Sequence, residues 1–245
     1  LKTQQFVLQK SKTERSECED AVGVNTEALR YAIADGATEA FDAGRWAERL
    51  ASEWVKTQGA LTIEDFGAWL AEQGSWLHAS WDGRTLSWFA EEKARVGSFA
   101  AFVGVEFDLS VDAPRWKAIA LGDSCLIHLR GGVVCSAFPL SDHQSFNSAP
   151  VLVPSLSSFQ ETALKQAVAD SGTLEQGDVV LLLSDAAAAW YLKLSLERDA
   201  ALKDLDALLK ASATDALEKL FEEERRAGRI KDDDVAILRI AVEYL

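Results

Sequence analysis

The chain has 245 residues, of which 48% are hydrophobic and 26% charged, a mix typical of globular proteins with a substantial core. Its net charge of -14 leaves no basic footprint, which excludes nucleic acid and anionic membranes as main partners. Three cysteines without a CxxC spacing form neither a disulfide framework nor a zinc site. We therefore expect a reducing, cytoplasmic location. No apolar run approaches the roughly 18 residues that span a bilayer.

The N-terminal third predicts strands followed by helices. Residues 6–8 form a short apolar strand, and residues 21–24 and 28–34 form a hairpin that ends at Asp35 and Gly36. From Asp42 to Gln58 apolar residues recur at helical spacing. A second helical stretch covers residues 62–94, with a break expected near Gly83. This stretch is rich in tryptophan, and we interpret its aromatic stripe as core packing and not as a ligand platform.

The rest of the chain returns to strands, then helices, then one last strand. Strands are predicted at 100–107, 116–121, 126–130, 133–135, 179–183 and 235–242. Helices are predicted at 186–194 and 202–226, and residues 141–158 indicate a long surface loop. This order is typical of an α+β fold with antiparallel sheets and segregated helices. We expect one domain over residues 1–245, present as a monomer.

Acidic residues recur where a predicted strand begins or ends. These residues are Glu19, Asp20, Asp35, Asp123, Asp185 and Asp233. Gathered at one sheet edge, such carboxylates would repel and raise one another's pKa values unless cations neutralise them. Hard oxygen ligands suit Mg²⁺ or Mn²⁺ better than Zn²⁺. Each aspartate alone could equally be a turn former or a helix cap, but so many in one context favour a metal site.

Five short motifs follow one another at spacings that fit a known family. They are Arg15-Ser16-Glu17-Cys18-Glu19-Asp20-Ala21, Ala34-Asp35-Gly36, Gly122-Asp123-Ser124, Ser184-Asp185 and Asp233-Asp234-Val235-Ala236. In this order they resemble the protein phosphatase 2C family of metal-dependent serine/threonine phosphatases, and specifically its compact bacterial branch. The resemblance covers nearly the whole chain. It implies a four-layer α-β-β-α sandwich, in which two antiparallel sheets are flanked by helices and a two-metal centre lies at one end.

The resemblance also implies roles for individual residues. Asp35 would bridge two Mg²⁺ or Mn²⁺ ions, and Gly36 would lend its carbonyl oxygen to one of them. The remaining ligands would be Asp185 and Asp233 for the first metal, Glu19 or Asp20 for the second, and Asp123 for a weak third. Arg15 matches the family's phosphate-binding arginine. The loop at 141–158 lies where the family carries a variable flap over its substrate.

These roles imply hydrolysis of phosphoserine or phosphothreonine in a phosphorylated protein. A metal-bound water would attack phosphorus in line, while the metals and Arg15 balance the charge of the phosphoryl oxygens. No covalent intermediate is needed, so Cys18 is not expected to be a nucleophile. Its expected role is that of a small apolar residue beside the site.

Two departures from the family pattern give some weight to an alternative function, although every metal-matching carboxylate is present. Ala186 stands where the family usually has glycine, and no histidine follows Asp35-Gly36 closely. Of the three histidines, only His143 is a candidate for a position near the site. The alternative is a phosphatase-like binding or regulatory adaptor with reduced catalysis. A calcium-buffering scaffold is disfavoured, because the sequence contains no EF-hand loop.

Overall fold

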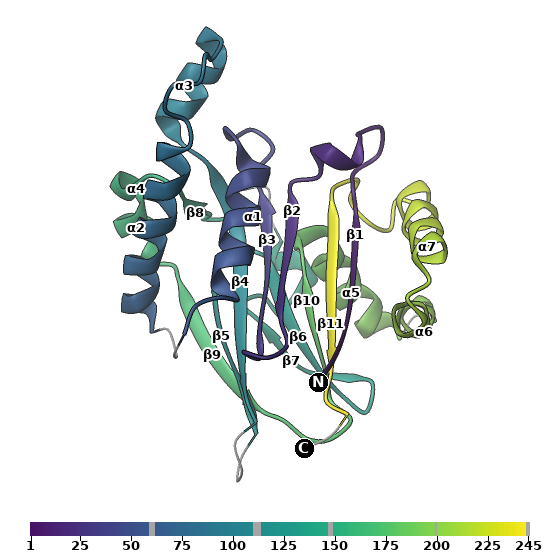
Figure 1. Ribbon diagram of the computed structural model, residues 1–245. Helices are drawn as coiled ribbons and strands as arrows, with labels where there is room; N and C mark the ends of the chain where they lie inside the picture. Colours follow the sequence, from purple (N-terminus) through teal and green to yellow (C-terminus); the bar gives the residue numbers. More distant parts are fainter. Residues whose placement is uncertain (59–61, 110–113, 147–148, 199, 244–245) are drawn as a thin grey trace.

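The computed structural model describes residues 1–58, 62–109, 114–146, 149–198 and 200–243. Two antiparallel sheets form its centre (Figure 1). Sheet A has the strand order β1 (Lys2–Leu8), β11 (Val235–Ala241), β10 (Val179–Leu183), β6 (Cys125–Arg130) and β7 (Val133–Phe138). Sheet B has the order β2 (Asp20–Asn25), β3 (Arg30–Gly36), β4 (Phe99–Asp108), β5 (Arg115–Leu121) and β9 (Val168–Thr173), with β8 (Val153–Pro154) paired to β4.

Helices cover the outer face of each sheet. The helices beside sheet B are α1 (Ala43–Trp54), α2 (Ile63–Ala79), α3 (Trp88–Val96) and α4 (Ser157–Leu164) (Figure 1). The helices beside sheet A are α5 (Asp185–Glu197), α6 (Ala201–Ala211) and α7 (Thr214–Arg226). The protein is therefore the four-layer α-β-β-α sandwich that the sequence predicts. Among the described helices, none has both the length and the apolar character of a bilayer span.

Alternation along the strands distributes the core among three layers. In β3, Tyr31 and Ile33 pack between the sheets, whereas Ala32 and Ala34 face the helices of sheet B. Small residues on the helix side let α1 approach closely. A Cβ atom on Gly23 would lie only 2.2 Å from the carbonyl oxygen of Ala51, so β2 tolerates no side chain there. The position of α1 against the hairpin is thus fixed by glycine and alanine.

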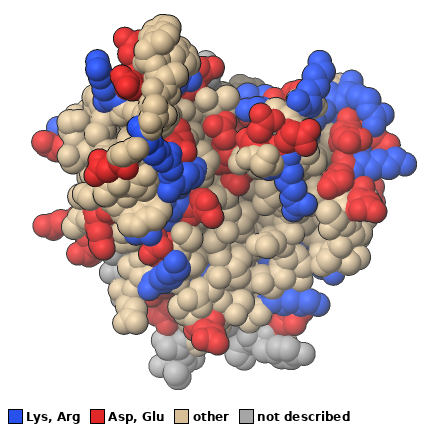
Figure 2. Space-filling view, turned by 45° about the horizontal axis from the view of Figure 1, so that its top comes forward, with Lys and Arg blue, Asp and Glu red and all other residues tan. Residues whose placement is uncertain are grey.

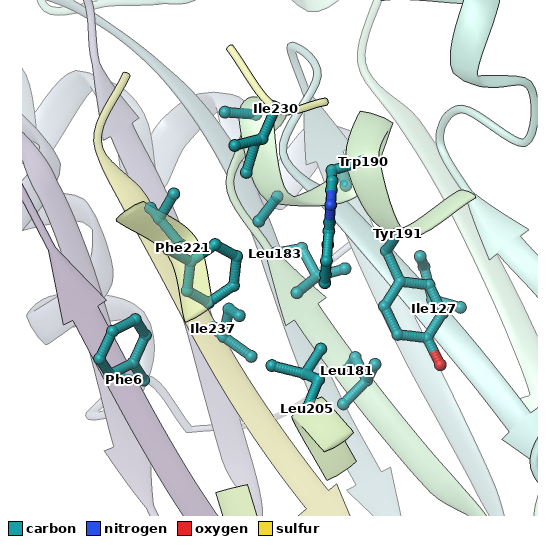
Figure 3. Close-up of a cluster of buried hydrophobic side chains, with 14 of the residues drawn as sticks. Phe6, Ile127, Leu181, Leu183, Trp190, Tyr191, Leu205, Phe221, Ile230 and Ile237 are labelled. Atoms are coloured by element: carbon teal, nitrogen blue, oxygen red, sulfur yellow. The ribbon is translucent and has the colours of Figure 1, made fainter. Parts of the chain in front are cut away.

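The third core layer lies between sheet A and its helices. Phe6, Leu181 and Ile237 of the sheet meet Trp190 of α5 and Phe221 of α7 (Figure 3). The ring centroids of Phe6 and Phe221 are 5.6 Å apart in a stacked arrangement, and those of Trp190 and Phe221 are 5.3 Å apart. Burying rings of this size stabilises the fold by roughly 2 kcal/mol each. This core holds α5, and therefore Asp185 at its first turn, against sheet A.

Most predicted elements are confirmed, and the differences have local causes. The helical stretch at 62–94 is broken as predicted, and Gly83 has a positive φ of 76°. The predicted helix at 202–226 is wrong as a single element, because Ser212 adopts φ 51° and separates α6 from α7. Predicted strand 6–8 is too short, since β1 begins at Lys2.

The prediction of one loop over 141–158 is wrong in part. The described residues of this segment contain a 3-10 turn (His143–Ser145) and β8, and α4 begins at Ser157. Residues 147–148 of the predicted loop lie outside the described part of the chain. Strand β9 was also not predicted, because its sequence, VADSGT, lacks the alternation of a half-buried strand and is mostly exposed. Edge strands of this kind are held by backbone pairing, here to β5.

The tryptophan-rich stretch is only partly core. Trp69 is 8% exposed and packs on Phe66 and Phe102, as predicted. Trp76 and Trp88, however, are 44% and 74% exposed, so the prediction of core packing is wrong for these two residues. The guanidinium group of Arg49 lies 4.1 Å from the ring centroid of Trp76 and covers its outer face.

Candidate metal centre at one end of the sandwich

Strand pleating turns three acidic side chains toward the gap between the two sheets. Asp35 shares the parity of Tyr31 and Ile33, which pack between the sheets, and it stands opposite Asp20 in the antiparallel register. Asp234 shares the parity of Ala236 in β11, which also packs between the sheets. All three lie at the same end of the sandwich, beyond the apolar core. Figure 2 brings this end forward and shows acidic and basic side chains interspersed over it.

Asp35 lies at the electrostatic centre of the acidic group. Burial raises its pKa well above the usual range, and four neighbouring carboxylates raise it further. These carboxylates are Asp20, Asp185, Asp233 and Asp123. The structure therefore brings together five of the six acids that the sequence singled out.

Asp20 is almost fully buried and lacks a hydrogen-bond partner. It is 9% exposed, and neither carboxylate oxygen makes a hydrogen bond to the described residues. Burial raises its pKa well above the usual value, the nearby hydroxyl group of Ser184 opposes this rise, and the charge of Asp234 adds to it. A buried carboxylate without partners costs several kcal/mol unless a cation or a proton neutralises it. In the metal-free protein the raised pKa of Asp20 favours the protonated form, and a bound cation would favour the charged form.

Glu19 is positioned by its own backbone. Its N–H group donates to Oδ2 of Asp234 at 2.8 Å, and the amide of Lys10 donates to Oδ1 of the same side chain at 2.7 Å. Both oxygens of Asp234 thus tie the end of β11 to the segments around β1 and β2. Glu19 Oε2 lies 3.6 Å from Lys10 Nζ, and Glu19 and Asp20 both line a cavity of 670 Å³.

Asp185 and Asp233 meet on one lysine. Lys231 Nζ lies 3.2 Å from Asp185 Oδ2 and 2.6 Å from Asp233 Oδ2. The two carboxylates come from different elements, the first turn of α5 and the loop before β11. One oxygen of each carboxylate points to the same place, and the ammonium group of Lys231 occupies it. The Lys231 side chain is 62% exposed, so it can leave at little cost in packing.

Gly36 and Asp123 complete the predicted set. Gly36 donates its N–H to Glu19 O at 3.0 Å, and a Cβ atom there would lie 2.8 Å from the backbone of Ala43. Its backbone is therefore pressed against both the Glu19 segment and the start of α1. Asp123 is 5% exposed, and burial, followed by the charge of Asp185, raises its pKa to about 6.

The oxygen ligands of this site suit hard divalent cations, but side chains must move before a cation can bind. The candidate ligands are carboxylate oxygens, and both oxygens of Asp20 and Oε2 of Glu19 are buried without hydrogen-bond partners. Within the described ranges, however, no three acidic, histidine or cysteine side chains stand in metal-ligand geometry as they are. Lys231 explains part of this, because it draws Asp185 and Asp233 toward itself. Metal binding at that pair requires Lys231 to move away.

Arg15 and Cys18 precede Glu19 and Asp20 in the chain, and Cys18 lines the same cavity as these two acids. Arg15 is exposed and begins a single 3-10 turn (Arg15–Glu17). Glu14 and Glu17 close this turn through reciprocal hydrogen bonds. Cys18 is partly buried, and burial raises the pKa of its thiol to about 12. A thiol that stays protonated is a poor nucleophile, which agrees with the expectation for Cys18.

The histidines and Ala186 account for the two departures noted in the sequence. His143 lines the same cavity as Asp185, whereas His128 is buried in β6 and bonded to Asp178 at 2.8 Å. His78 lies 3.1 Å from the hydroxyl group of Ser155. Ala186 is a helical residue of α5 without a positive φ, so the position does not demand glycine.

Sequence reasoning missed two residues that order the centre. Asp234 belongs to the fifth sequence motif, but no role was predicted for it. Within the run 232–234, it shares the strand parity of Ala236, which packs between the sheets. Arg225 of α7 received no attention. Its guanidinium group, 8% exposed, donates to the carbonyl oxygen of Gln9 at 3.0 Å and to that of Asp233. A sequence gives no signal for such a contact, because it joins positions 216 residues apart.

Comparison with known proteins rests on structure. No family model and no curated protein matches the chain by sequence. The Mycobacterium tuberculosis serine/threonine phosphatase PstP is similar over 99% of both chains, with a TM-score of 0.64 and 17% identity. The PstP catalytic domain in complex with two manganese ions is similar over 97% of this chain and 96% of that one (TM-score 0.59, 16% identity). The photosystem II phosphatase PBCP is similar over 100% and 99% (TM-score 0.60, 16% identity).

A further similar structure is that of the PPM serine/threonine phosphatase MsPP from Mycobacterium smegmatis, with a TM-score of 0.55 and 15% identity over 99% and 98% of the two chains. The similarity therefore extends over the entire sandwich and not over one motif. At these identities it shows a common fold. The chain has the fold of the metal-dependent serine/threonine phosphatases, as the order of its five motifs implied.

Proposed function

We propose that this protein is a monomeric cytoplasmic phosphatase that hydrolyses phosphoserine or phosphothreonine in phosphorylated proteins, with Mg²⁺ or Mn²⁺ as cofactors. The observation that carries the proposal is the convergence of four carboxylates on Asp35, at one end of a sandwich shared with serine/threonine phosphatases. A folded chain that keeps buried carboxylates together without partners is less stable than one without them. Their retention is explained if cations neutralise them during the protein's work.

The candidate ligands divide into two groups around Asp35. Asp185 and Asp233, which both pair with Lys231, would hold one metal together with Asp35. Glu19 or Asp20 would serve the other, the Gly36 carbonyl would serve one of the two, and Asp123 would hold a weaker third. Bound divalent cations would supply positive charge that acidifies a water and stabilises the phosphoryl oxygens.

The chain's own residues would bind and orient the phosphoryl group. Arg15 lies five residues before Asp20 on an exposed turn, and a guanidinium group can hold two phosphoryl oxygens in a bidentate contact. His143 is the one histidine of the three that lines the cavity beside Asp185. An imidazole in that position can donate a proton to the departing serine or threonine oxygen.

A second candidate function has its own support. The pairing of Lys231 with Asp185 and Asp233 also fits a phosphoprotein-binding adaptor in which an internal cation has replaced a metal. Such a protein would bind phosphopeptides and turn them over slowly or not at all. Turnover is therefore the measurement that separates the two functions.

The test is release of phosphate from a phosphothreonine peptide, with Mn²⁺ and with EDTA. We expect turnover in Mn²⁺ and none in EDTA. Asp35→Asn and Asp185→Asn should each lower kcat by about a thousandfold or more, because each removes charge at the reacting group. Asp170→Asn, on the exposed edge strand β9, is the matched control and should leave turnover unchanged. Undiminished turnover in EDTA, or in both site variants, would contradict the proposal.

Arg15 provides a separate test of phosphate recognition. Arg15→Ala should weaken binding of the phosphopeptide, while Mn²⁺ affinity and melting temperature stay as in the wild type. Arg15→Lys should restore only part of the loss, because an ammonium group lacks the fork geometry of guanidinium. If both variants bind phosphopeptide like the wild type, Arg15 is a surface charge worth at most about 1 kcal/mol.

A further inference from the structure

A second cavity adjoins the metal centre on the side of sheet A. Its volume is 340 Å³, and it begins at Asp185 and follows one face of α5 through Ala186 and Ala189 to Lys193. The loop 229–231 and His143 also line it. The cavity is therefore continuous with the acidic centre at Asp185 and extends away from it along the helix.

The charge of this cavity is opposite to that of the protein. The chain has a net charge of -14, yet the cavity lining contains Lys193, Arg229, Lys231 and His143 against a single acid, Asp185. Lys231 is held by carboxylates, as described above. Lys193, in contrast, is half-buried and has no ion pair or hydrogen bond from its side chain within the described residues. An ammonium group in that setting is suited to a ligand carboxylate.

The floor of the cavity is rigid. Trp190 is 2% exposed, and its indole Nε1 donates to Glu224 Oε2 at 2.9 Å. The buried Glu224 also accepts from Arg229 Nε at 2.8 Å. Ile230 lies above Trp190 at the upper edge of the sheet A core (Figure 3). A chain of hydrogen bonds thus fixes Arg229 and the wall, so the cavity exists before a ligand arrives.

We propose that this cavity binds an acidic side chain of the phosphoprotein substrate, close in sequence to the phosphorylated residue, and that Lys193 recognises it. The proposal rests on the proposed function, because the metal centre fixes where the phosphorylated residue sits. Eight residues of α5 separate Asp185 from Lys193, a rise of about 12 Å. An extended peptide covers that distance in about four residues. The enzyme therefore prefers substrates with aspartate or glutamate within about four positions of the phosphorylated residue.

The test compares phosphothreonine peptides that carry glutamate, glutamine or lysine at each of the four positions on either side. At the preferred position, wild type should favour glutamate over glutamine about fivefold in kcat/KM, mainly through KM. Lys193→Met should remove this preference without changing the rate on the glutamine peptide. Lys193→Glu should invert it in favour of the lysine peptide. Lys219→Met, an exposed lysine of α7, is the control and should change nothing.

Two results would overturn the inference. One is a wild type that shows no preference at any position, and the other is an equal effect of Lys193→Glu on all three peptides. Failure of this inference and failure of the proposed function can be told apart by measuring binding of the same peptides by fluorescence anisotropy. If no peptide is hydrolysed but the charge preference is present in wild-type binding and inverted in Lys193→Glu, the cavity assignment stands and the phosphatase assignment falls.

Discussion

Two groups of buried acids in this protein have opposite electrostatics. At the candidate metal centre, burial and neighbouring carboxylates raise the pKa values of Asp20 and Asp35. At the other group, Asp178 is 1% exposed but receives Arg130 Nη2 at 2.8 Å and His128 Nε2 at 2.8 Å. These partners overcome the cost of burial and lower the pKa of Asp178 to about 2. Within the described residues, only the carboxylate of the second group has hydrogen-bond partners for both of its oxygens.

The difference lies in what the neighbouring residues supply. The Trp116 indole donates to His128 Nδ1 at 3.3 Å, so the neutral ring carries its proton on Nε2 and can donate to Asp178. Every polar atom in this series of hydrogen bonds from Trp116 through His128 to Asp178 has a partner, which is the pattern of a structural network. Asp20 has none among the described residues. A buried charge that the fold leaves unpaired is typical of a functional site, because its partner arrives as a ligand.

The largest expected effect is a pair of opposite changes from one substitution. Asp35→Asn should lower turnover about a thousandfold, and it should raise the melting temperature of the metal-free protein by a few degrees. The stabilisation follows from removing one charge from a cluster that repels itself. Thermal unfolding in EDTA and a turnover assay measure the two effects. A variant that is both inactive and less stable in EDTA would show Asp35 to be structural.

Asp178→Asn should give the reverse result. The substitution removes the charge and turns one of the two acceptor oxygens into an NH2 donor that faces Arg130 or His128, and breaking a buried pair costs about 3 kcal/mol. We expect a melting temperature lower by about 10 °C and, below it, nearly normal kcat. Loss of turnover without loss of stability would show that Asp178 acts in catalysis and would contradict the distinction between a functional and a structural group of acids.

The pH dependence of stability should also differ in sign between the groups. Acids with a raised pKa, such as Asp35, destabilise the folded protein at high pH, so their penalty disappears as the pH falls below the folded pKa. The metal-free protein should therefore gain stability from this group as the pH falls through the raised folded pKa values, and Asp35→Asn should show a smaller gain. Asp178 has a lowered pKa, and its contribution is present above its unfolded value and is lost only as the pH falls toward about 2. Equal slopes in wild type and Asp35→Asn would contradict this account.

The smallest expected effect concerns the internal cation. Lys231 occupies the point on which Asp185 and Asp233 converge, so a divalent ion must displace it. Lys231→Met should raise the affinity for Mn²⁺ about fivefold, the value of a partly exposed ion pair. Lys193→Met, in the same cavity but without a carboxylate partner in the described chain, is the control. Calorimetry with Mn²⁺ measures both, and a lower affinity in Lys231→Met would mean that the lysine assists metal binding.

The fold was largely predictable because its strands carry strong local patterns. The apolar run at 179–183 and the Gly131-Gly132 turn needed no tertiary information, and both appear as predicted, with positive φ at both glycines. Strand β9 and helix α4 were missed because they are held by neighbours and have weak patterns of their own. Local sequence decides an element only where propensity and burial agree.

The candidate centre was predictable in its acids and not in its partners. Strand ends identified Asp20, Asp35 and Asp185, since pleating and sheet edges follow from local sequence. The contacts of Lys231 and Arg225 depend on how α5, α7 and the loop before β11 pack together. Such contacts join distant positions and leave no periodic trace. The acidic cluster could therefore be located from sequence, whereas the residues that pair with its acids or position them required the structure.

Titration of Mn²⁺ into the metal-free full chain is the most direct test of the account. The account predicts saturable binding of more than one ion, loss of most of that binding in Asp35→Asn, and no loss in Asp178→Asn below its melting temperature. At a hundredfold excess over Kd, bound metal should stabilise the wild type by about 2.7 kcal/mol. An absence of saturable binding in the millimolar range, or equal binding by wild type and Asp35→Asn, would contradict the claim that these acids form a metal centre.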